Sequence, residues 1–203
     1  MKAALVILGA TDGVGRGVVQ AAIAADRPVI AVARDDRELH ALRSAYRDAD
    51  ITVLPGTIID DVGGAELATT LRELGRPLAG VIAVVAGNAH HGRLLDQPAE
   101  FLRRKLDETL MPHLVAARHL VPVLAKANRG ASYLLIGGPG SEQPWAGHGD
   151  RSIAGAALHM LARVLHNEAL ALSVRVQLLS VDTPVRTDAN NGCGCPQWPT
   201  ARA

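Results

Sequence analysis

The chain has 203 residues, a formal net charge of +1 and 20% charged residues. This near-neutral balance argues against nucleic acid as a partner, and no apolar run approaches the roughly 18 residues that span a bilayer. We therefore expect a soluble, cytoplasmic protein with no membrane partner. A chain of this length is predicted to form a single domain over residues 1–203 with a real hydrophobic core.

Short β-branched runs alternate with amphipathic stretches almost from end to end. The runs are apolar on both faces, which is typical of a parallel sheet covered by helices on each side. Predicted strands cover residues 4–8, 28–33, 51–54, 80–86, 132–137 and 174–180, and predicted helices lie near residues 14–25, 35–47, 62–74, 98–126 and 152–172. Pro112 is expected in the first turn of a helix opened by Thr109, where its missing N–H costs nothing. The alternation predicts an α/β fold, a doubly wound parallel sheet with right-handed crossovers.

Two groups of metal-ligand residue types attract attention. Cys193 and Cys195 form a CxC pair in the loop-like tail 182–203. Because two ligands do not make a zinc site, we expect a reduced pair in a loop. His90 and His91 are adjacent and therefore point apart, so a metal there would need a third ligand. We expect no metal site.

The first predicted strand runs directly into GATDGVGRG, in which Gly9, Gly13 and Gly15 are spaced Gly-x3-Gly-x-Gly. Glycines at these positions let the chain turn sharply and let a diphosphate approach the backbone. The following helix offers free N–H groups and its positive dipole end. A glycine-rich turn alone would fit any tight turn, but one placed between a strand and a helix indicates a dinucleotide site.

This spacing resembles that of the short-chain dehydrogenases/reductases, and the similarity extends over nearly the whole chain. Further matches, in family order, are AVARDDREL after the second strand, VVAG at 84–87, RHLVP at 118–122, SIAGAAL at 152–158 and VRV at 174–176. The resemblance implies an NAD(P)-binding Rossmann fold with helices on both faces of the sheet. It also implies hydride transfer between a nicotinamide and a carbonyl or alcohol of a small-molecule substrate.

In this family, the residues at the end of the second strand determine whether NAD or NADP is preferred. The acid that holds the ribose 2′-hydroxyl in NAD-preferring members aligns with Ala33, and Arg34 follows it. An arginine can meet two oxygens of a 2′-phosphate at once, so we expect NADP(H) rather than NAD(H), unless Arg34 merely ends a strand at the surface. The candidate cofactor-binding residues are Gly9, Thr11, Asp12, Gly13, Val14, Gly15, Arg34, Asp35, Thr57, Ala86 and Gly87.

The family's catalytic residues are a serine, a tyrosine, a lysine four residues later and an asparagine. The aligned positions in this chain all carry other residues, in that order Gly138, Arg151, Gly155 and Thr109. A shifted alignment cannot restore the pair, because neither Tyr46 nor Tyr133 is followed by a lysine at that spacing. The resemblance therefore implies a divergent member that lacks the usual catalytic set.

Four residues of the same segment are candidates to replace the missing groups. His148 has a suitable ordinary pKa, and Asp150 could be its partner. Arg151 cannot give up a proton but could hold an anionic substrate, and Ser141 and Ser152 supply hydroxyls. For each of them the alternative is an ordinary loop residue. Ser152 would then be a helix N-cap and His148 a surface residue.

Three functions remain open from the sequence. The first is a binding, regulatory or partner subunit that retains the NADP(H) site without the reductase chemistry. The second is an NADPH-dependent oxidoreductase rebuilt around His148, Arg151 and Ser152. The third is a structural scaffold with a vestigial nucleotide site. Because relatives associate through the helices near 98–126 and 152–172, the resemblance also implies a homo-oligomer, a dimer or a tetramer.

Overall fold

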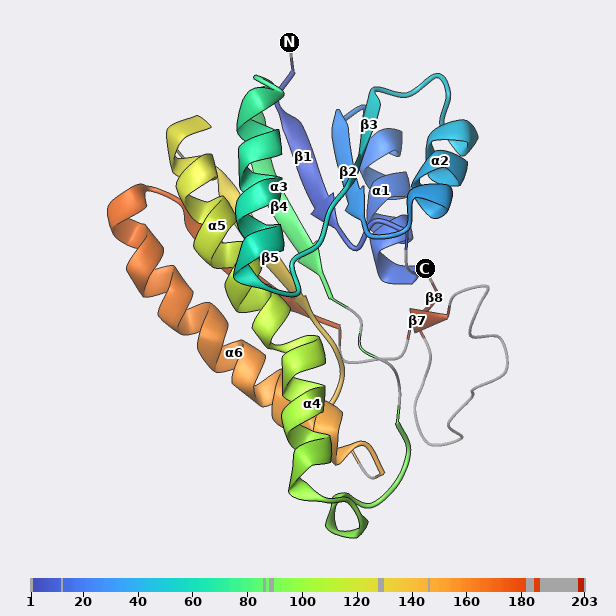
Figure 1. Ribbon diagram of the computed structural model, residues 1–203, viewed down its shortest axis with the longest axis vertical. Helices are drawn as coiled ribbons and strands as arrows, with labels where there is room; N and C mark the ends of the chain where they lie inside the picture. The colour runs from blue at the N-terminus through green and yellow to red at the C-terminus, as the bar shows by residue number, and fades with distance from the viewer. Residues whose placement is uncertain are drawn as a thin grey trace.

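The computed structural model describes residues 2–11, 13–85, 87, 90–127, 130–145 and 147–181, with the backbone of 185–186 and 201–202. A six-stranded parallel sheet runs through its centre (Figure 1). Its strands are β1 (Ala4–Leu8), β2 (Val29–Ala33), β3 (Ile51–Pro55), β4 (Leu78–Val84), β5 (Ser132–Gly137) and β6 (Arg175–Ser180). They lie in the order β3-β2-β1-β4-β5-β6, so the winding reverses between β1 and β4. Sheets of this kind bind ligands at such a reversal, outside the carboxyl ends of the strands.

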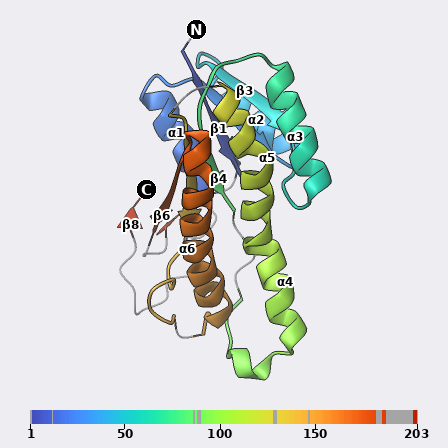
Figure 2. The same cartoon turned by 90° about the vertical axis from the view of Figure 1, so that its left-hand side faces the viewer.

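The helices cover both faces of this sheet (Figures 1 and 2). One face carries α1 (Gly13–Ala24) and α2 (Asp36–Ala45), and the other carries α3 (Asp61–Glu73), α5 (Met111–Ala127) and α6 (Gly149–Ala169). α4 (Ala99–Thr109) continues the line of α5 beyond the sheet (Figure 2). The short 3-10 helices η1 (Leu94–Asp96) and η2 (Leu170–Leu172) and a separate strand pair, β7 (Val185–Arg186) with β8 (Ala201–Arg202), complete the described elements.

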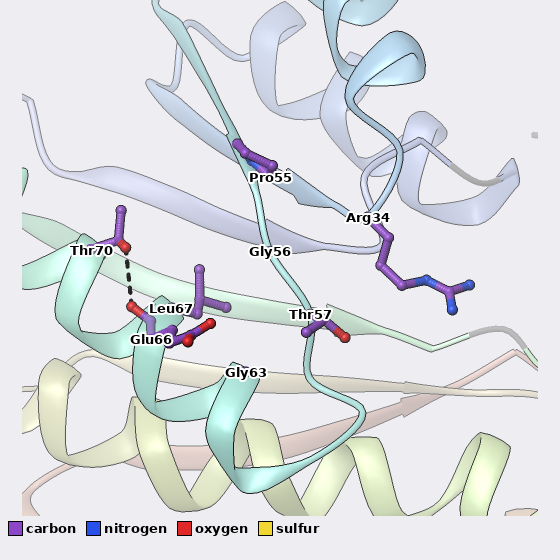
Figure 3. A pocket seen from close by; sticks show the side chains of 8 residues that line it. All are labelled: Arg34, Pro55, Gly56, Thr57, Gly63, Glu66, Leu67 and Thr70. Atoms are coloured by element: carbon purple, nitrogen blue, oxygen red, sulfur yellow. Dashed lines mark hydrogen bonds between the residues drawn. The ribbon is translucent and has the colours of Figure 1, made fainter.

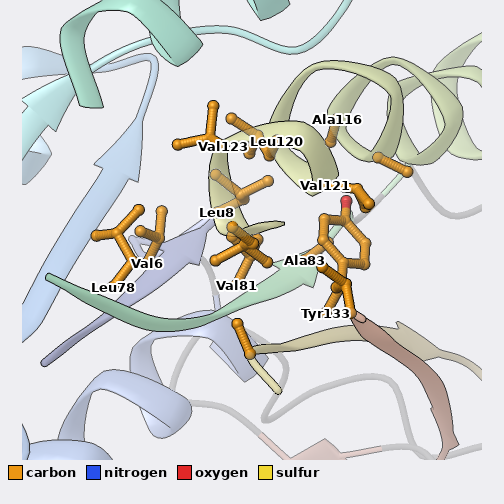
Figure 4. Packing of buried hydrophobic residues seen from close by; sticks show 14 of the residues in the cluster. Val6, Leu8, Leu78, Val81, Ala83, Ala116, Leu120, Val121, Val123 and Tyr133 are labelled. Carbon is orange, nitrogen blue, oxygen red and sulfur yellow. The ribbon is translucent and has the colours of Figure 1, made fainter. Parts of the chain in front are cut away.

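Alternate residues of each central strand enter two different cores. Val6 and Leu8 of β1 pack in the cluster that holds Leu120 of α5 (Figure 4). Ile7, which lies between them, packs on the other face with Leu39 of α2. Because side chains of a strand alternate between faces, a strand buried on both sides needs an unbroken apolar run. That requirement explains why the central strands read as continuous apolar runs rather than alternating patterns.

The predicted fold class is confirmed, and one helix prediction was wrong. The helix expected near 98–126 is two helices, because α4 ends at Thr109 and α5 begins at Met111. Pro112 has no N–H to continue the hydrogen-bond ladder of α4, although Pro122 lies inside α5 without ending that helix. Pro112 lies in the first turn of α5, as expected, but the expectation that Thr109 opens this helix was wrong, because Thr109 is the last residue of α4.

Candidate functional site

The turn at the end of β1 has a backbone that only glycine fits at two positions. Gly9 has a φ of +71°, and a Cβ there would collide with the carbonyl oxygen of Val84 on β4. A Cβ on Gly15 would collide in turn with the carbonyl oxygen of Gly9. The two glycines therefore bring the first turn of α1 against the strand end, which leaves the helix N-terminus facing the point where the winding reverses.

The other members of the predicted glycine turn are placed less completely. Gly13 begins α1, Val14 is half-buried in its first turn, and Thr11 is half-buried just before it. Asp12 lies outside the described residues. The carboxylate of Asp35 caps α2, accepting hydrogen bonds from the backbone N–H groups of Arg37 (2.8 Å) and Glu38 (3.2 Å). Both bonds go to Oδ1, and a role of Asp35 on a cofactor stays a prediction.

Arg34 and Thr57 line one cavity at the edge of the sheet (Figure 3). The cavity has a volume of ≈ 450 Å³, within the range of small-molecule sites. It lies between the ends of β2 and β3 and the first turns of α3, and its lining residues are Arg34, Pro55, Gly56, Thr57, Gly63, Glu66, Leu67 and Thr70. The arginine and the threonine predicted to meet the cofactor are therefore brought together.

The segment after β4 passes close to the end of α4. A Cβ on Gly87 would collide with the methyl group of Thr109. The hydroxyl of Thr109 donates a hydrogen bond to the carbonyl oxygen of Lys105, at 2.6 Å, so it is engaged within its own helix. Ala86 lies outside the described residues. Thr109 therefore closes the helix end rather than offering a free hydroxyl to a ligand.

The other aligned catalytic positions differ in how much space they leave. A Cβ on Gly138 would have nothing within 4 Å, so the position after β5 is open. A Cβ on Gly155 of α6 would lie 3.0 Å from the Cβ of Ser141, so that space is already filled. Ser141 is itself held near β6, with its Oγ 3.4 Å from the Oγ of Ser180. Arg151 is half-buried in the first turn of α6.

The two described tyrosines offer no substitute for the missing one. Tyr133 of β5 has no exposed surface, and its hydroxyl has no hydrogen-bond partner among the described residues. Burial raises the pKa of Tyr133 above its ordinary value. Tyr46 ends α2 on the opposite face of the sheet from α6. Neither phenol can reach a substrate beside Gly138 and give it a proton.

His148 lies at the start of α6 in a cluster of rings. Its ring is 4.1 Å from that of Trp145 and 5.1 Å from that of His91, between centroids, and the His91 contact is edge-on. Its Nδ1 is 2.8 Å from the carbonyl oxygen of His90. A carbonyl can only accept, so Nδ1 carries the hydrogen and Nε2 of the neutral ring keeps its lone pair. The alternative that His148 is an ordinary surface residue was wrong, because the residue is only 8% exposed.

Burial lowers the pKa of His148 below its ordinary value. The hydrogen bond to the carbonyl of His90 acts in the opposite direction, as does the carboxylate of Asp150, whereas the charges of Arg151 and His91 lower the pKa further. The ring is therefore neutral at pH 7, and its Nε2 can accept a proton. An imidazole with a free Nε2 has the chemistry of a general base.

The hydroxyl of Ser152 is used within the loop that carries these rings. It accepts a hydrogen bond from the backbone N–H of Trp145 (2.9 Å) and donates one to the carbonyl oxygen of His148 (3.3 Å). The expectation that Ser152 caps the helix was wrong, since α6 begins at Gly149 and His148 occupies the cap position. Its hydroxyl therefore holds the loop and is not free for a substrate.

The structure adds site residues that the sequence patterns did not reveal. Trp145 was a visible signal, as one of two tryptophans in the chain, but nothing in its spacing pointed to His148. Glu66 carries no motif. Only its helical spacing with Gly63 and Thr70, three and four residues away, places it on the face of α3 that meets the loop after β3.

The described residues include neither a metal centre nor a membrane-spanning helix. No three His, Cys, Asp or Glu side chains among them are grouped to hold a metal ion, and Cys193 and Cys195 lie outside this part of the chain. No helix in the part that the structure describes is long and apolar enough to cross a membrane.

Comparison with known proteins gives one family and many similar folds. The chain matches the family model described as enoyl-(acyl carrier protein) reductase over residues 9–198. Among solved structures it is similar to a short-chain type dehydrogenase/reductase from Mycobacterium ulcerans, with a TM-score of 0.83 and 20% identity, covering 93% of this chain and 70% of that one. A short-chain dehydrogenase from Streptomyces avermitilis has a TM-score of 0.78 and 24% identity, covering 100% and 71%.

A third similar structure is a short chain oxidoreductase from Pseudomonas aeruginosa, described as NADPH-bound and as containing an atypical catalytic center. Its TM-score is 0.82 at 20% identity, covering 92% of this chain and 73% of that one. At such identities these structures establish the fold alone. No curated protein matches the chain.

Proposed function

Because the chain belongs to the short-chain dehydrogenase/reductase family, we propose that it binds NADP(H) without the tyrosine–lysine proton transfer and serves as a binding, regulatory or partner subunit. One contrast carries this proposal. At the end of β1, Gly9 and Gly15 keep the close backbone approach that a diphosphate needs. At the start of α6, Arg151 and Gly155 stand where the resemblance places the tyrosine and the lysine.

The described residues fit the two anionic parts of the cofactor. The glycine turn and the N-terminus of α1 offer backbone N–H groups and a positive dipole end to the diphosphate. Arg34 has no hydrogen bond or ion pair within the described residues, so its guanidinium is available to a 2′-phosphate. When bound, the nicotinamide would supply or accept a hydride, and a proton would have to come from a group other than a tyrosine.

A second candidate function is an NADPH-dependent oxidoreductase acting on a small carbonyl or alcohol. The observation that favours it is the neutral His148 ring, buried and fixed with Nδ1 on the carbonyl of His90. Its Nε2 could exchange the proton, and the half-buried Arg151 could hold an anionic substrate. The similar Pseudomonas aeruginosa oxidoreductase is described as having an atypical catalytic center, so departure from the usual residues does not by itself argue against activity.

The third possibility, a scaffold with a vestigial nucleotide site, is less well supported. Gly9 and Gly15 do not separate the two cases, because a Cβ at either would strike backbone whether or not a nucleotide binds. The observation against a vestigial site is Arg34, which lines a cavity with Thr57 and has no partner among the described residues. Homo-oligomerisation belongs to the proposal, because α5 and α6 expose several large apolar side chains, Met111, Leu114, Ile153, Met160 and Val164. A strict monomer in light scattering would contradict it. A cytoplasmic location stays a prediction.

The test compares two arginine variants in calorimetric titrations. Arg34→Ala should weaken NADPH binding by about tenfold or more, the effect of losing charge-assisted hydrogen bonds, and should leave NADH binding unchanged. Arg27→Ala removes the same charge from an exposed position at the opposite end of β2 and should change neither. Equal losses for NADPH and NADH would contradict a 2′-phosphate site at Arg34.

A further inference from the structure

The cavity beside β3 holds two opposite charges that do not pair with each other. Arg34 extends from the end of β2 and Glu66 from α3, on either side of the segment from Pro55 to Thr57 (Figure 3). Within the described residues, neither side chain makes a hydrogen bond or an ion pair. An arginine and a glutamate that line one cavity unpaired leave both charges available to a ligand.

The remaining polar groups of this cavity are engaged locally. The Oγ1 of Thr57 accepts a hydrogen bond from the backbone N–H of Ile59, at 3.3 Å. The Oγ1 of Thr70 donates one to the carbonyl oxygen of Glu66, at 3.0 Å. The carboxylate of Glu66 is therefore the strongest free acceptor of the cavity, and the guanidinium of Arg34 is its strongest free donor.

The approach of α3 to the loop after β3 is a built feature. A Cβ on Gly63 would collide with the side chain of Thr57, and a Cβ on Gly56 would lie 3.3 Å from the Cδ1 of Leu67. Glycine at these two positions lets the helix come close enough for Glu66 to line the same cavity as Arg34. Pro55 and Leu67 give that cavity apolar surface for a flat ring.

A ligand that satisfies both charges must carry an anionic group and, apart from it, a hydrogen-bond donor. The phosphorylated adenosine of NADP(H) has both, in its 2′-phosphate and in the exocyclic amine of its adenine. We propose that Glu66 accepts a hydrogen bond from this amine while Arg34 binds the phosphate, so that Glu66 selects adenine over bases without the amine. The inference rests on the proposed NADP(H) binding and names the residue that reads the base.

The test replaces the amine of the ligand and the carboxylate of the protein in turn. Calorimetric titrations use NADPH and nicotinamide hypoxanthine dinucleotide phosphate, reduced form, whose base has an oxygen in place of the amine. The wild-type chain should prefer NADPH by about tenfold, the effect of one charge-assisted hydrogen bond. Glu66→Gln can donate as well as accept, so it should bring the two affinities to within about twofold.

Glu73→Gln is the matched control, because it makes the same change of charge at an exposed position on the same helix outside the cavity. It should keep the preference of the wild-type chain. Equal binding of the two dinucleotides by the wild-type chain, or an unchanged preference in Glu66→Gln, would overturn the role of Glu66 and leave NADP(H) binding intact. Failure of the wild-type chain to bind NADPH would overturn both proposals.

Discussion

The turn after β1 and the segment from β5 into α6 both follow the carboxyl ends of strands in the same parallel sheet. They differ in what holds their residues in place. In the first, Gly9 and Gly15 are required by contacts with backbone atoms that the fold itself creates. In the second, a Cβ on Gly138 would face open space, and Ser141 already occupies the space that a Cβ on Gly155 would enter. A constraint imposed by the backbone limits the residue type, whereas a position that serves only chemistry can change without disturbing the fold. This is how one chain can keep a dinucleotide turn beside a changed catalytic segment.

The largest expected effect is a loss of stability when a glycine of the turn after β1 is replaced. Gly9→Ala should lower the free energy of unfolding by about 3 kcal/mol, because a Cβ there is strained by the positive φ and strikes the carbonyl of Val84. Gly17→Ala is the control, since a Cβ there meets nothing within 4 Å. It should raise stability by up to about 1 kcal/mol in the same helix-forming segment. Denaturant unfolding measures both, and a neutral Gly9→Ala would contradict the geometry of the turn.

The next effect concerns pH and the buried histidines on the α5 side of the sheet. Burial lowers the pKa of His113 from its ordinary value of 6.5 to about 4. The folded state therefore binds fewer protons than the unfolded state below pH 6.5. The stability from the neutral ring is fully present above that pH and is lost as the pH falls towards 4, by about 3 kcal/mol. The lowered pKa of His148 acts in the same direction.

Unfolding measured between pH 4 and pH 7.5 separates the two rings. His113→Leu should remove most of the loss of stability in acid, because the ring is almost fully buried in α5. His148→Ala should leave most of that loss in place. A wild-type stability that does not change over this range would contradict the neutral state of both rings.

A smaller effect tests whether Tyr133 has any part in chemistry. Its hydroxyl is buried without a partner among the described residues, so Tyr133→Phe should raise the free energy of unfolding by about 1 kcal/mol. NADPH binding should not change, because the ring lies in the core (Figure 4). A loss of stability in this variant would show that the hydroxyl has a partner in solution.

The smallest effect concerns the loop before α6. Ser152→Ala removes the acceptor for the N–H of Trp145 and should cost about 1 kcal/mol. Ser44→Ala, at an exposed position in α2, is the control and should have no such cost. Near-ultraviolet circular dichroism should also change only in Ser152→Ala, because Trp145 is the ring held by this bond. An unaltered stability would mean that Ser152 is free and available to a substrate.

Much of the fold could be predicted because the spacing of apolar residues along the chain follows which faces of each strand and helix are buried. The strand of Val6, Ile7 and Leu8 is apolar throughout because it is covered on both faces. The break at Leu110 was missed because the apolar pattern continues through it. That residues 1–203 form a single domain stays a prediction.

The site was less predictable, because its interactions join distant parts of the chain. The bond between His148 and the carbonyl of His90 spans 58 residues and involves a backbone atom that no residue pattern reveals. Ser152 resembled a helix cap because its residue type suits one, but α6 begins three residues earlier. Glu66 reaches the cavity of Arg34 only because Gly63 lets α3 approach the loop after β3. Each of these depends on tertiary geometry.

The most direct test of the central claim is a calorimetric titration of the full chain with NADPH and, separately, with NADH. NADPH should bind saturably and NADH at least about tenfold more weakly, since only NADPH carries the phosphate that Arg34 can bind. The absence of binding by either dinucleotide at about millimolar concentration, an affinity near the weak end of specific recognition, would contradict the account. It would leave the chain as a scaffold that has kept the glycine turn for packing alone.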